Sequence, residues 1–176
     1  MNPNTRRLTS STGILVQAVQ DLEDFTDDPD KYLVDLYADE HRAVKVWMSA
    51  GASDHFTYND GAITLAWDGI PLLGVPDWHD ICTLWTYLVN VVEGYLATGR
   101  GASFFPGQPT PIVLERIHGG ALVTIGDTRA RVDPSTFCRE LLDEAGRFWQ
   151  WVERHDIPLY GEPELARIDQ MQARVP

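Results

Sequence analysis

The chain is 176 residues long, the size of one ordinary domain, and its content of 44% hydrophobic and 23% charged residues is typical of a globular protein. Its formal net charge of −12 disfavours direct binding to nucleic acid, because phosphate backbones repel an acidic protein. Two cysteines are too few for a disulfide framework, and no apolar run approaches the roughly 18 residues of a membrane span, so we expect a cytoplasmic protein with reduced thiols and no membrane contact.

The negative charge is concentrated in the first third of the chain. Nine acidic residues and one lysine stand between Asp21 and Glu40, so this stretch alone carries a charge of −8. An acidic surface of this kind suits a basic protein partner. The alternative is that it only keeps the protein dissolved. The acidic residues that we single out as candidates for partner binding are Asp24, Asp27, Asp28, Asp30 and Asp35.

The beginning of the chain predicts an arm followed by two helices. Residues 1–9 are expected to form a disordered arm, ahead of a single domain over residues 10–158. A helix is predicted up to residue 25 by an apolar face at helical spacing, although the alternation over residues 14–19 also permits a strand. The members of that face are Ile14, Ala18, Leu22 and Phe25. A second short helix is expected to begin with Asp28 as its N-cap and Pro29 in its first position.

A period of two predicts strands between residues 43 and 75. The expected strands cover residues 43–48, 54–58, 62–67 and 70–75. Asp68 and Gly69 are a pair of the kind that closes two-residue hairpins, and Pro71 indicates that the last strand lies at a sheet edge or is irregular. The segment therefore predicts an antiparallel meander of three or four strands.

Two long amphipathic helices dominate the rest of the chain. The first is expected between Asp77, as N-cap, and Gly99, as C-cap. Two or three strands follow over residues 111–132, and the second long helix begins with Asp133 as N-cap and Pro134 in its first position. The tail, residues 159–176, is predicted to hold one short helix. Together these elements predict a single-domain α+β fold, with antiparallel meanders packed against the two long helices and one or two helices at the N-terminus.

The segment FFPGQP, residues 104–109, interrupts this pattern between the first long helix and the next strand. Pro106 and Gly107 are typical of a type II turn, so we interpret the segment as a rigid corner between helix and strand. Phe104 and Phe105 point to opposite sides of an extended chain. One of them is expected to enter the core, and the other to remain exposed as a candidate contact for a partner.

The residues capable of catalysis or metal binding do not form a specific pattern. His79, Cys82, His118 and Cys138 lie in three different predicted elements, which argues against a zinc site. Both cysteines fall in the first turn of a helix, where a thiol is readily activated, but their neighbours follow a core pattern. We therefore predict no catalytic residue, no metal and no cofactor.

Six tryptophans leave two interpretations open. Trp47, Trp67, His79 and Trp85 are candidates for the lining of a small-molecule pocket between sheet and helix, and the alternative is that the tryptophans only fill the core. Trp149 and Trp151 are about 200° apart on a helix, so one of them is expected at the boundary of the core.

The order of elements over residues 43–152 carries a resemblance. A meander, a helix with aromatic and aliphatic residues, a Phe-Pro-x-Gln-Pro-like corner, a hairpin and a final helix beginning near a phenylalanine follow one another. This run resembles a diffuse group of small uncharacterised bacterial proteins, many of them actinobacterial, and some of these resemble immunity proteins of polymorphic toxin systems. The resemblance implies a non-enzymatic binding protein whose acidic third faces a basic toxin domain, and it carries over no catalytic residue.

The sequence thus leads to two hypotheses for function. The first is a non-enzymatic cytosolic binding protein, immunity-like, that uses its acidic face to bind a basic protein. The alternative is a small-molecule binder or an enzyme with an aromatic pocket. Association into a homo-oligomer stays open under both.

Overall fold

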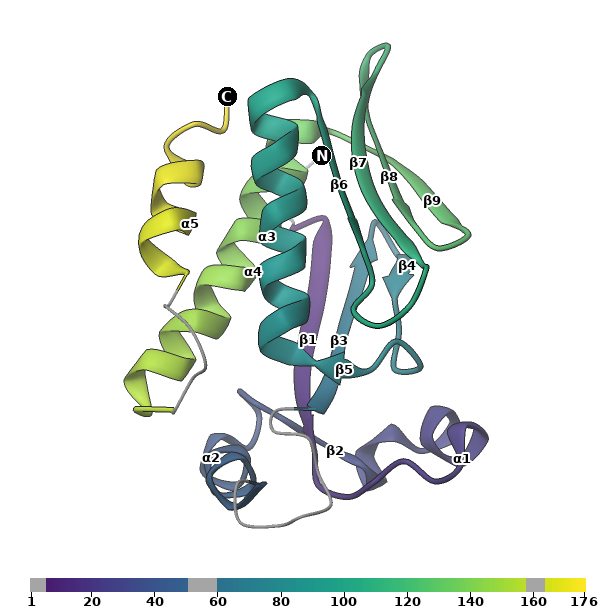
Figure 1. The fold of residues 1–176 in the computed structure, drawn as a ribbon, viewed down its shortest axis with the longest axis vertical. Coiled ribbons are helices and arrows are strands. Elements are labelled where there is room, and N and C mark those ends of the chain that lie inside the picture. The colour runs from purple at the N-terminus through teal and green to yellow at the C-terminus, as the bar shows by residue number, and fades with distance from the viewer. Residues whose placement is uncertain (1–5, 51–59, 158–163) are drawn as a thin grey trace.

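The computed structural model describes residues 6–50, 60–157 and 164–176. It contains two antiparallel sheets and, within these residues, five α-helices, so the α+β class is confirmed. The helices are α1 (Leu22–Asp27), α2 (Glu40–Ala50), α3 (Ile81–Thr98), α4 (Pro134–Arg154) and α5 (Leu165–Gln172). The long helices α3 and α4 pack together in the upper part of the molecule, and α1 and α2 lie at its lower end (Figure 1).

The first sheet, sheet A, is built from the N-terminal part of the chain. Its strands are β1 (Leu8–Leu15), β2 (Leu33–Asp35), β3 (Asp60–Trp67), β4 (Ile70–Leu73) and β5 (His79–Asp80), in the order β2-β1-β3-β4 with β5 also paired to β3. Asp68 and Gly69 close the β3–β4 hairpin with φ angles of 47° and 82°, both positive as a type I′ turn requires. Pro71 lies in the edge strand β4, as predicted.

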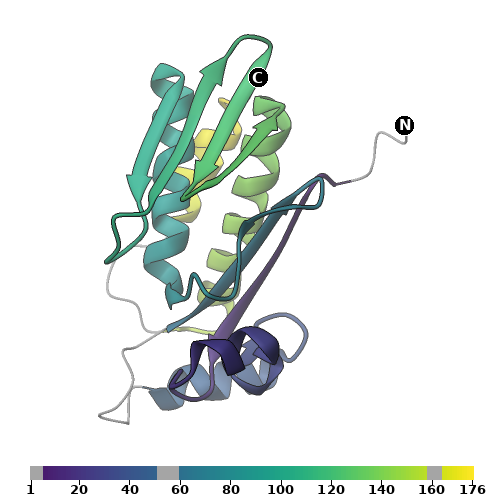
Figure 2. The same ribbon diagram turned by 90° about the vertical axis from the view of Figure 1, so that its right-hand side faces the viewer.

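The second sheet, sheet B, is a four-stranded meander. It consists of β6 (Arg100–Phe104), β7 (Pro111–Ile117), β8 (Gly120–Ile125) and β9 (Thr128–Val132), paired in chain order. The helices α3, α4 and α5 all lie behind one face of this sheet, and the other face is turned to the viewer in Figure 2. The sequence predicted β7, β8 and β9 but not β6, because its five residues include a glycine and follow directly on the helix cap.

The strand β6 runs unusually close to helix α3. Gly94 of the helix and Gly101 of the strand face each other, and a Cβ atom added to Gly94 would lie 3.0 Å from the Cα of Gly101. The helix ends at Gly99, whose φ of 82° is the left-handed conformation of a glycine C-cap. This cap turns the chain back on itself, so that the strand can follow the helix without a connecting loop.

A large core with several aromatic rings joins the two sheets to α2, α3, α4 and α5. Phe148 of α4 is fully buried, and its ring centroid lies 6.1 Å from that of Trp85, 6.3 Å from that of Trp47 and 5.0 Å from that of Trp149. The two helices predicted to be amphipathic therefore meet through their apolar faces. The tail helix α5 joins the same core through Ile168 and Met171, which confirms a short helix in the tail.

The N-terminal elements differ from the prediction. β1 occupies the start of the expected first helix, and Leu8 is buried within it, so a disordered arm is wrong for residues 8 and 9. The strand is paired on both sides, with β2 and β3, and its residues 12–15 are all buried. A central strand buried on both faces loses its alternation, and this continuous apolar run imitates a helical pattern.

The next two segments were also assigned wrongly. The second helix expected after Asp28 is a single 3-10 turn (Pro29–Lys31) followed by β2, and the side chain of Asp28 makes no capping hydrogen bond. The strand expected over residues 43–48 is part of helix α2, in which Ala43 and Trp47, four residues apart, point into the core. The strand expected over residues 54–58 lies outside the described residues.

The predicted N-cap is confirmed for α4, whereas for α3 the N-cap lies three residues later than predicted. Asp133 accepts a hydrogen bond from the amide of Thr136 at 2.9 Å, as an N-cap does. The N-cap of α3 is Asp80, which accepts from the amide of Thr83, and not Asp77. Asp77 instead accepts from the amide of Gly74 in the preceding turn, because β5 separates it from the helix.

Candidate functional site

The acidic segment forms a separate end of the molecule, with a small apolar cluster of its own. Residues 21–35, here called the acidic end, comprise α1, the 3-10 turn and β2, at the lower right of Figure 1. Leu15, Phe25 and Tyr32 are buried together in this cluster, with the rings of Phe25 and Tyr32 in edge-to-face contact at 5.3 Å. Val75 and Trp78 cover it from the segment that precedes α3. The acidic end is thus held in one conformation by its own apolar packing.

Two of the candidate carboxylates accept hydrogen bonds from neighbouring groups of the chain. Asp24 accepts hydrogen bonds from the ammonium of Lys31, at 2.5 Å, and from the hydroxyl of Tyr32, and these bonds hold the pKa of Asp24 below its usual range. Asp35 accepts from the amides of Tyr37 and Ala38 at 2.8 and 2.9 Å and so closes the turn after β2. Asp24 and Asp35 therefore shape the acidic end more than they offer charge to a partner.

The other acidic residues of the segment are directed to solvent. Asp27, Asp28 and Asp30, together with Glu23, are exposed and form no ion pair or side-chain hydrogen bond with any described residue. We call these four the open carboxylates. They include three of the five acidic residues singled out from the sequence, and Glu23 in addition. Their charges are available to a basic surface.

Leu22 is exposed beside the open carboxylates. Its exposed fraction is 53%, one of the largest for any apolar side chain in the described part of the chain. The sequence pattern predicts Leu22 on an apolar helical face, as part of one continuous helix through Phe25. With α1 beginning only at Leu22, the register of that face is lost and Phe25 alone is buried from this helix. An exposed leucine with charged neighbours fits the apolar centre and polar rim of a protein interface.

The predicted separation of the two phenylalanines is confirmed. Phe105 is 2% exposed and Phe104 is 62% exposed. The amide of Gln108 donates to the carbonyl of Phe105, at 3.1 Å, around a turn in which Gly107 has a φ of 69°, as in a type II turn. The expected helix-to-strand corner is wrong in one respect, since β6 precedes it and the segment is the β6–β7 hairpin turn.

His79 links this hairpin turn to the acidic end. Its ring contacts that of Phe105 edge-on, with centroids 6.1 Å apart, and the neighbouring Trp78 covers the cluster of Phe25 and Tyr32. The two groups of candidate residues, the acids and the phenylalanine pair, are therefore joined through the segment before α3. Phe104 itself points away from this junction, to the exposed side of β6.

The candidate pocket residues lie in three separate neighbourhoods. Trp47 and Trp85 pack on Phe148, Trp67 packs on Phe137 with centroids 5.4 Å apart, and His79 packs on Phe105. Each of the three tryptophans is at most 3% exposed. These side chains are members of the core, and their role in ligand binding stays a prediction.

The expectation that Trp149 or Trp151 lies at a boundary is wrong. Both are buried, at 4% and 0% exposure, because α4 is covered on more than one side. α3 and strand β1 cover one side of it, α5 packs along another, and Trp47 of α2 reaches Trp151 with centroids 5.5 Å apart.

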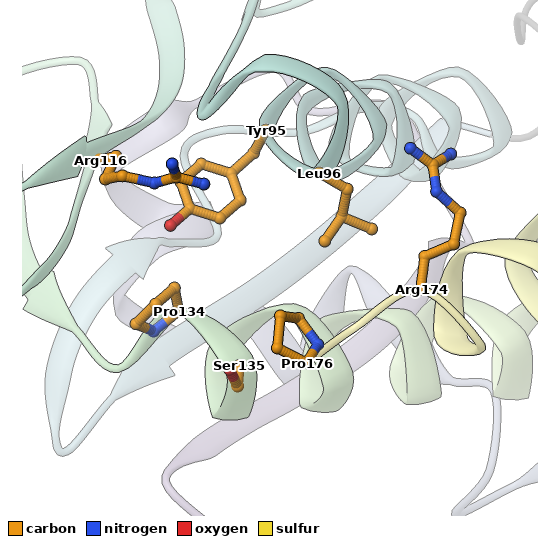
Figure 3. Close-up of a pocket in the computed structure, with 7 residues that line it drawn as sticks. All are labelled: Tyr95, Leu96, Arg116, Pro134, Ser135, Arg174 and Pro176. Atoms are coloured by element: carbon orange, nitrogen blue, oxygen red, sulfur yellow. The ribbon is translucent and has the colours of Figure 1, made fainter.

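A cavity of about 190 Å³ lies on the helical side of sheet B (Figure 3). Its lining comes from four distant parts of the chain, which is why the sequence did not indicate it: Tyr95, Leu96, Arg116, Pro134, Ser135, Arg174 and Pro176. The guanidinium of Arg116 lies over the Tyr95 ring, 5.9 Å from its centroid, at the end of α3 where a cation stabilises the helix dipole. The Arg116 side chain thus lies against the end of α3.

The two cysteines are poorly suited to nucleophilic chemistry. Both are free thiols, Cys138 buried and Cys82 half-buried. Burial, assisted by Asp133, raises the pKa of Cys138 to about 12, and burial with Asp80 nearby raises that of Cys82. Among the described residues, no group of three or more His, Cys, Asp and Glu side chains is placed to hold a metal ion.

These thiols predict a simple labelling result. In the folded protein at neutral pH, Ellman's reagent should react slowly with both cysteines, because a thiol with a pKa of about 12 is ionised to only roughly one part in a hundred thousand. In denaturant, both should react at once. Rapid reaction of one thiol in the folded state would contradict the burial described here and would make that cysteine a candidate nucleophile.

Comparison of the chain with protein-family models, with curated proteins and with solved structures finds no match in any of the three. The search for membrane spans, made over the residues that the structure describes, finds no helix with the length and apolar character to cross a bilayer.

Proposed function

We propose that this protein is a non-enzymatic binding protein of the cytoplasm, immunity-like, whose acidic end binds a basic protein. One observation carries the proposal: four open carboxylates and the exposed side chain of Leu22 share one short segment, residues 22–30, which Phe25 anchors in an apolar cluster. A small apolar anchor within a charged rim is the usual composition of a protein interface. The expected resemblance to a group of small bacterial proteins, some of which resemble immunity proteins, points to the same function.

The open carboxylates favour a basic partner for an energetic reason. Each is solvated and unpaired, so a partner's lysine or arginine does not first have to break an internal ion pair. The paired carboxylate of Asp24 shows the contrast, since Lys31 and Tyr32 already occupy it. Concentrated negative charge also speeds the encounter with a basic protein, and salt weakens this effect.

The rigidity of the acidic end adds to affinity. Phe25 anchors α1 in the apolar cluster, and Tyr32 anchors the end of the 3-10 turn there. Trp78, from the segment before α3, packs on the same cluster. A platform of this kind loses little conformational entropy when a partner docks. The partner therefore meets a preformed surface.

Capture of a partner tests the proposal. Purified protein is immobilised and exposed to a lysate of the native host, or to the product of an adjacent toxin-like gene, at low and at high salt. A variant with Asp27→Asn, Asp28→Asn and Asp30→Asn should retain the partner roughly tenfold less well, since each exposed ion pair contributes about 0.2–1 kcal/mol. Retention should also fall as salt is raised.

The matched control removes the same charge elsewhere. Asp127, Glu153 and Asp169 are exposed and lie outside the acidic end, and their replacement by Asn, Gln and Asn changes the net charge equally. This control should retain the partner as the wild type does. Equal loss in both variants would reduce the effect to net charge, and no retained protein at low salt would refute the proposal.

A further inference from the structure

One face of sheet B has no covering element in the described part of the molecule. Figure 2 shows it in front, with α3, α4 and α5 behind the sheet. The side chains on the inner face, such as Ile112, Leu114 and Val123, are buried against those helices. The alternate positions of the same strands form what we call the outer face.

The outer face combines an apolar centre with basic margins. The strand register places Ala102 beside Val113, and Glu115 beside Leu122, while Phe104 stands at the end of β6 with 62% of its surface exposed. The apolar side chains are thus partly open to solvent over three neighbouring strands. Exposed apolar surface bordered by charge is characteristic of a docking surface.

Three arginines flank this centre. Arg129 and Arg131 lie on the outer face of β9, and Arg100 on that of β6 across from Glu115, 3.8 Å away. The guanidinium of Arg131 donates to the carbonyls of His118 and Gly119 at 2.8 and 3.0 Å, which holds it in place. With one glutamate among three arginines the face is cationic, on a chain whose net charge is −12.

This charge pattern selects among occupants. Two outer faces packed against each other would bring arginines together, which is unfavourable. The occupant that fits carries several carboxylates and an apolar side chain. The acidic end of this same chain has that composition, with four open carboxylates and the exposed Leu22.

We propose that the outer face of sheet B binds the acidic end of a second copy of this chain. The contact is head-to-tail, because it joins two different surfaces, so each copy offers one free end to the next. It does not depend on the existence of a foreign partner. Self-association would compete with such a partner for the acidic end. A copy would then have to leave the self-associated form before its acidic end could bind the partner.

Two complementary variants test this arrangement. The first, Arg129→Glu with Arg131→Glu, removes the basic surface and keeps the acidic end. The second, Asp27→Lys with Asp28→Lys, removes the acidic end and keeps the basic surface. Sedimentation velocity over a wide concentration range at low salt should show association of the wild type, weakened roughly tenfold or more in each variant alone. Circular dichroism and thermal melting establish that each variant is folded.

Mixing the variants gives the decisive result. One intact acidic end and one intact outer face remain in the mixture, so a one-to-one complex should form and grow no further. A control with Arg139→Glu and Arg174→Glu, both exposed on the helical side, has the same net charge as the first variant and should associate as the wild type does.

Three outcomes would overturn the inference. A monomeric wild type at all concentrations would do so, as would equal weakening by the control. Failure of two folded variants to combine would exclude the head-to-tail arrangement. None of these outcomes bears on the capture of a basic partner. The first variant should retain the partner at least as well as the wild type, because its acidic end is intact and no longer occupied by a second copy.

Discussion

Replacing Gly101 with alanine should remove a large part of the stability of this protein. A Cβ atom at this position would lie 1.7 Å from the carbonyl oxygen of Val91 and 3.0 Å from the amide nitrogen of Tyr95. Both neighbours are backbone atoms of α3, so no side-chain rotation relieves the clash. The strand has to move away from the helix, and the apolar contacts of both elements are loosened. Overpacking of this severity costs about 3 kcal/mol or more.

The matched control for this substitution is Gly146→Ala. Gly146 lies inside helix α4, and a Cβ atom there would have its nearest neighbour, a methyl group of Ile168, at an ordinary 3.7 Å. Alanine should stabilise the helix at this site by up to about 1 kcal/mol. Urea unfolding followed by circular dichroism measures both variants. Equal stability of the Gly101 variant and the wild type would show that β6 does not pack on α3 as described.

Replacing Phe105 with alanine should destabilise the protein by about 3–5 kcal/mol, whereas the same change at Phe104 should cost less than about 1 kcal/mol. Phe105 is buried at 2% exposure against His79, and its loss leaves a cavity under the β6–β7 turn. Phe104 is 62% exposed and therefore loses much less buried surface. The two neighbouring substitutions thus differ in effect although they are chemically identical.

A binding measurement separates the two phenylalanines further. The Phe104 variant should unfold like the wild type yet self-associate more weakly, because Phe104 belongs to the outer face of sheet B. Chemical unfolding gives the first quantity and sedimentation the second. If both variants lose several kcal/mol of stability, the hairpin turn is purely structural and Phe104 has no part in binding.

Most of the C-terminal two thirds of the fold could be predicted because its signals are local; β6 and the exact start of α3 could not. Pro134 begins α4, Gly99 ends α3, and the Asp-Gly turn sits where a two-residue hairpin requires it. The N-terminal third could not be predicted in this way. Its first strand is buried on both faces, and α2 contains the short alternation around Trp47, which fits a strand equally well. Only the packing of Trp47 against Phe148 and Trp151 decides for a helix.

The candidate site shows a similar division. Composition alone located the acidic segment, because charge density needs no knowledge of the fold. It could not distinguish the paired carboxylate of Asp24 from the open one of Asp28, since the partners Lys31 and Tyr32 are set by the 3-10 turn. The position of Leu22 was also predicted wrongly, because the pattern does not show where the helix begins. Exposure depends on where a helix begins, and that boundary is the least certain part of a sequence pattern.

The most direct test of the central claim is the affinity for a purified basic partner, measured by titration at several salt concentrations. For the wild type and for the control altered at Asp127, Glu153 and Asp169, the dissociation constant should rise steeply with salt, because the open carboxylates bind through charge. For the variant altered at Asp27, Asp28 and Asp30, binding should be roughly tenfold weaker at low salt and respond less to it. The same affinity and the same salt dependence in all three proteins would contradict binding through the acidic end.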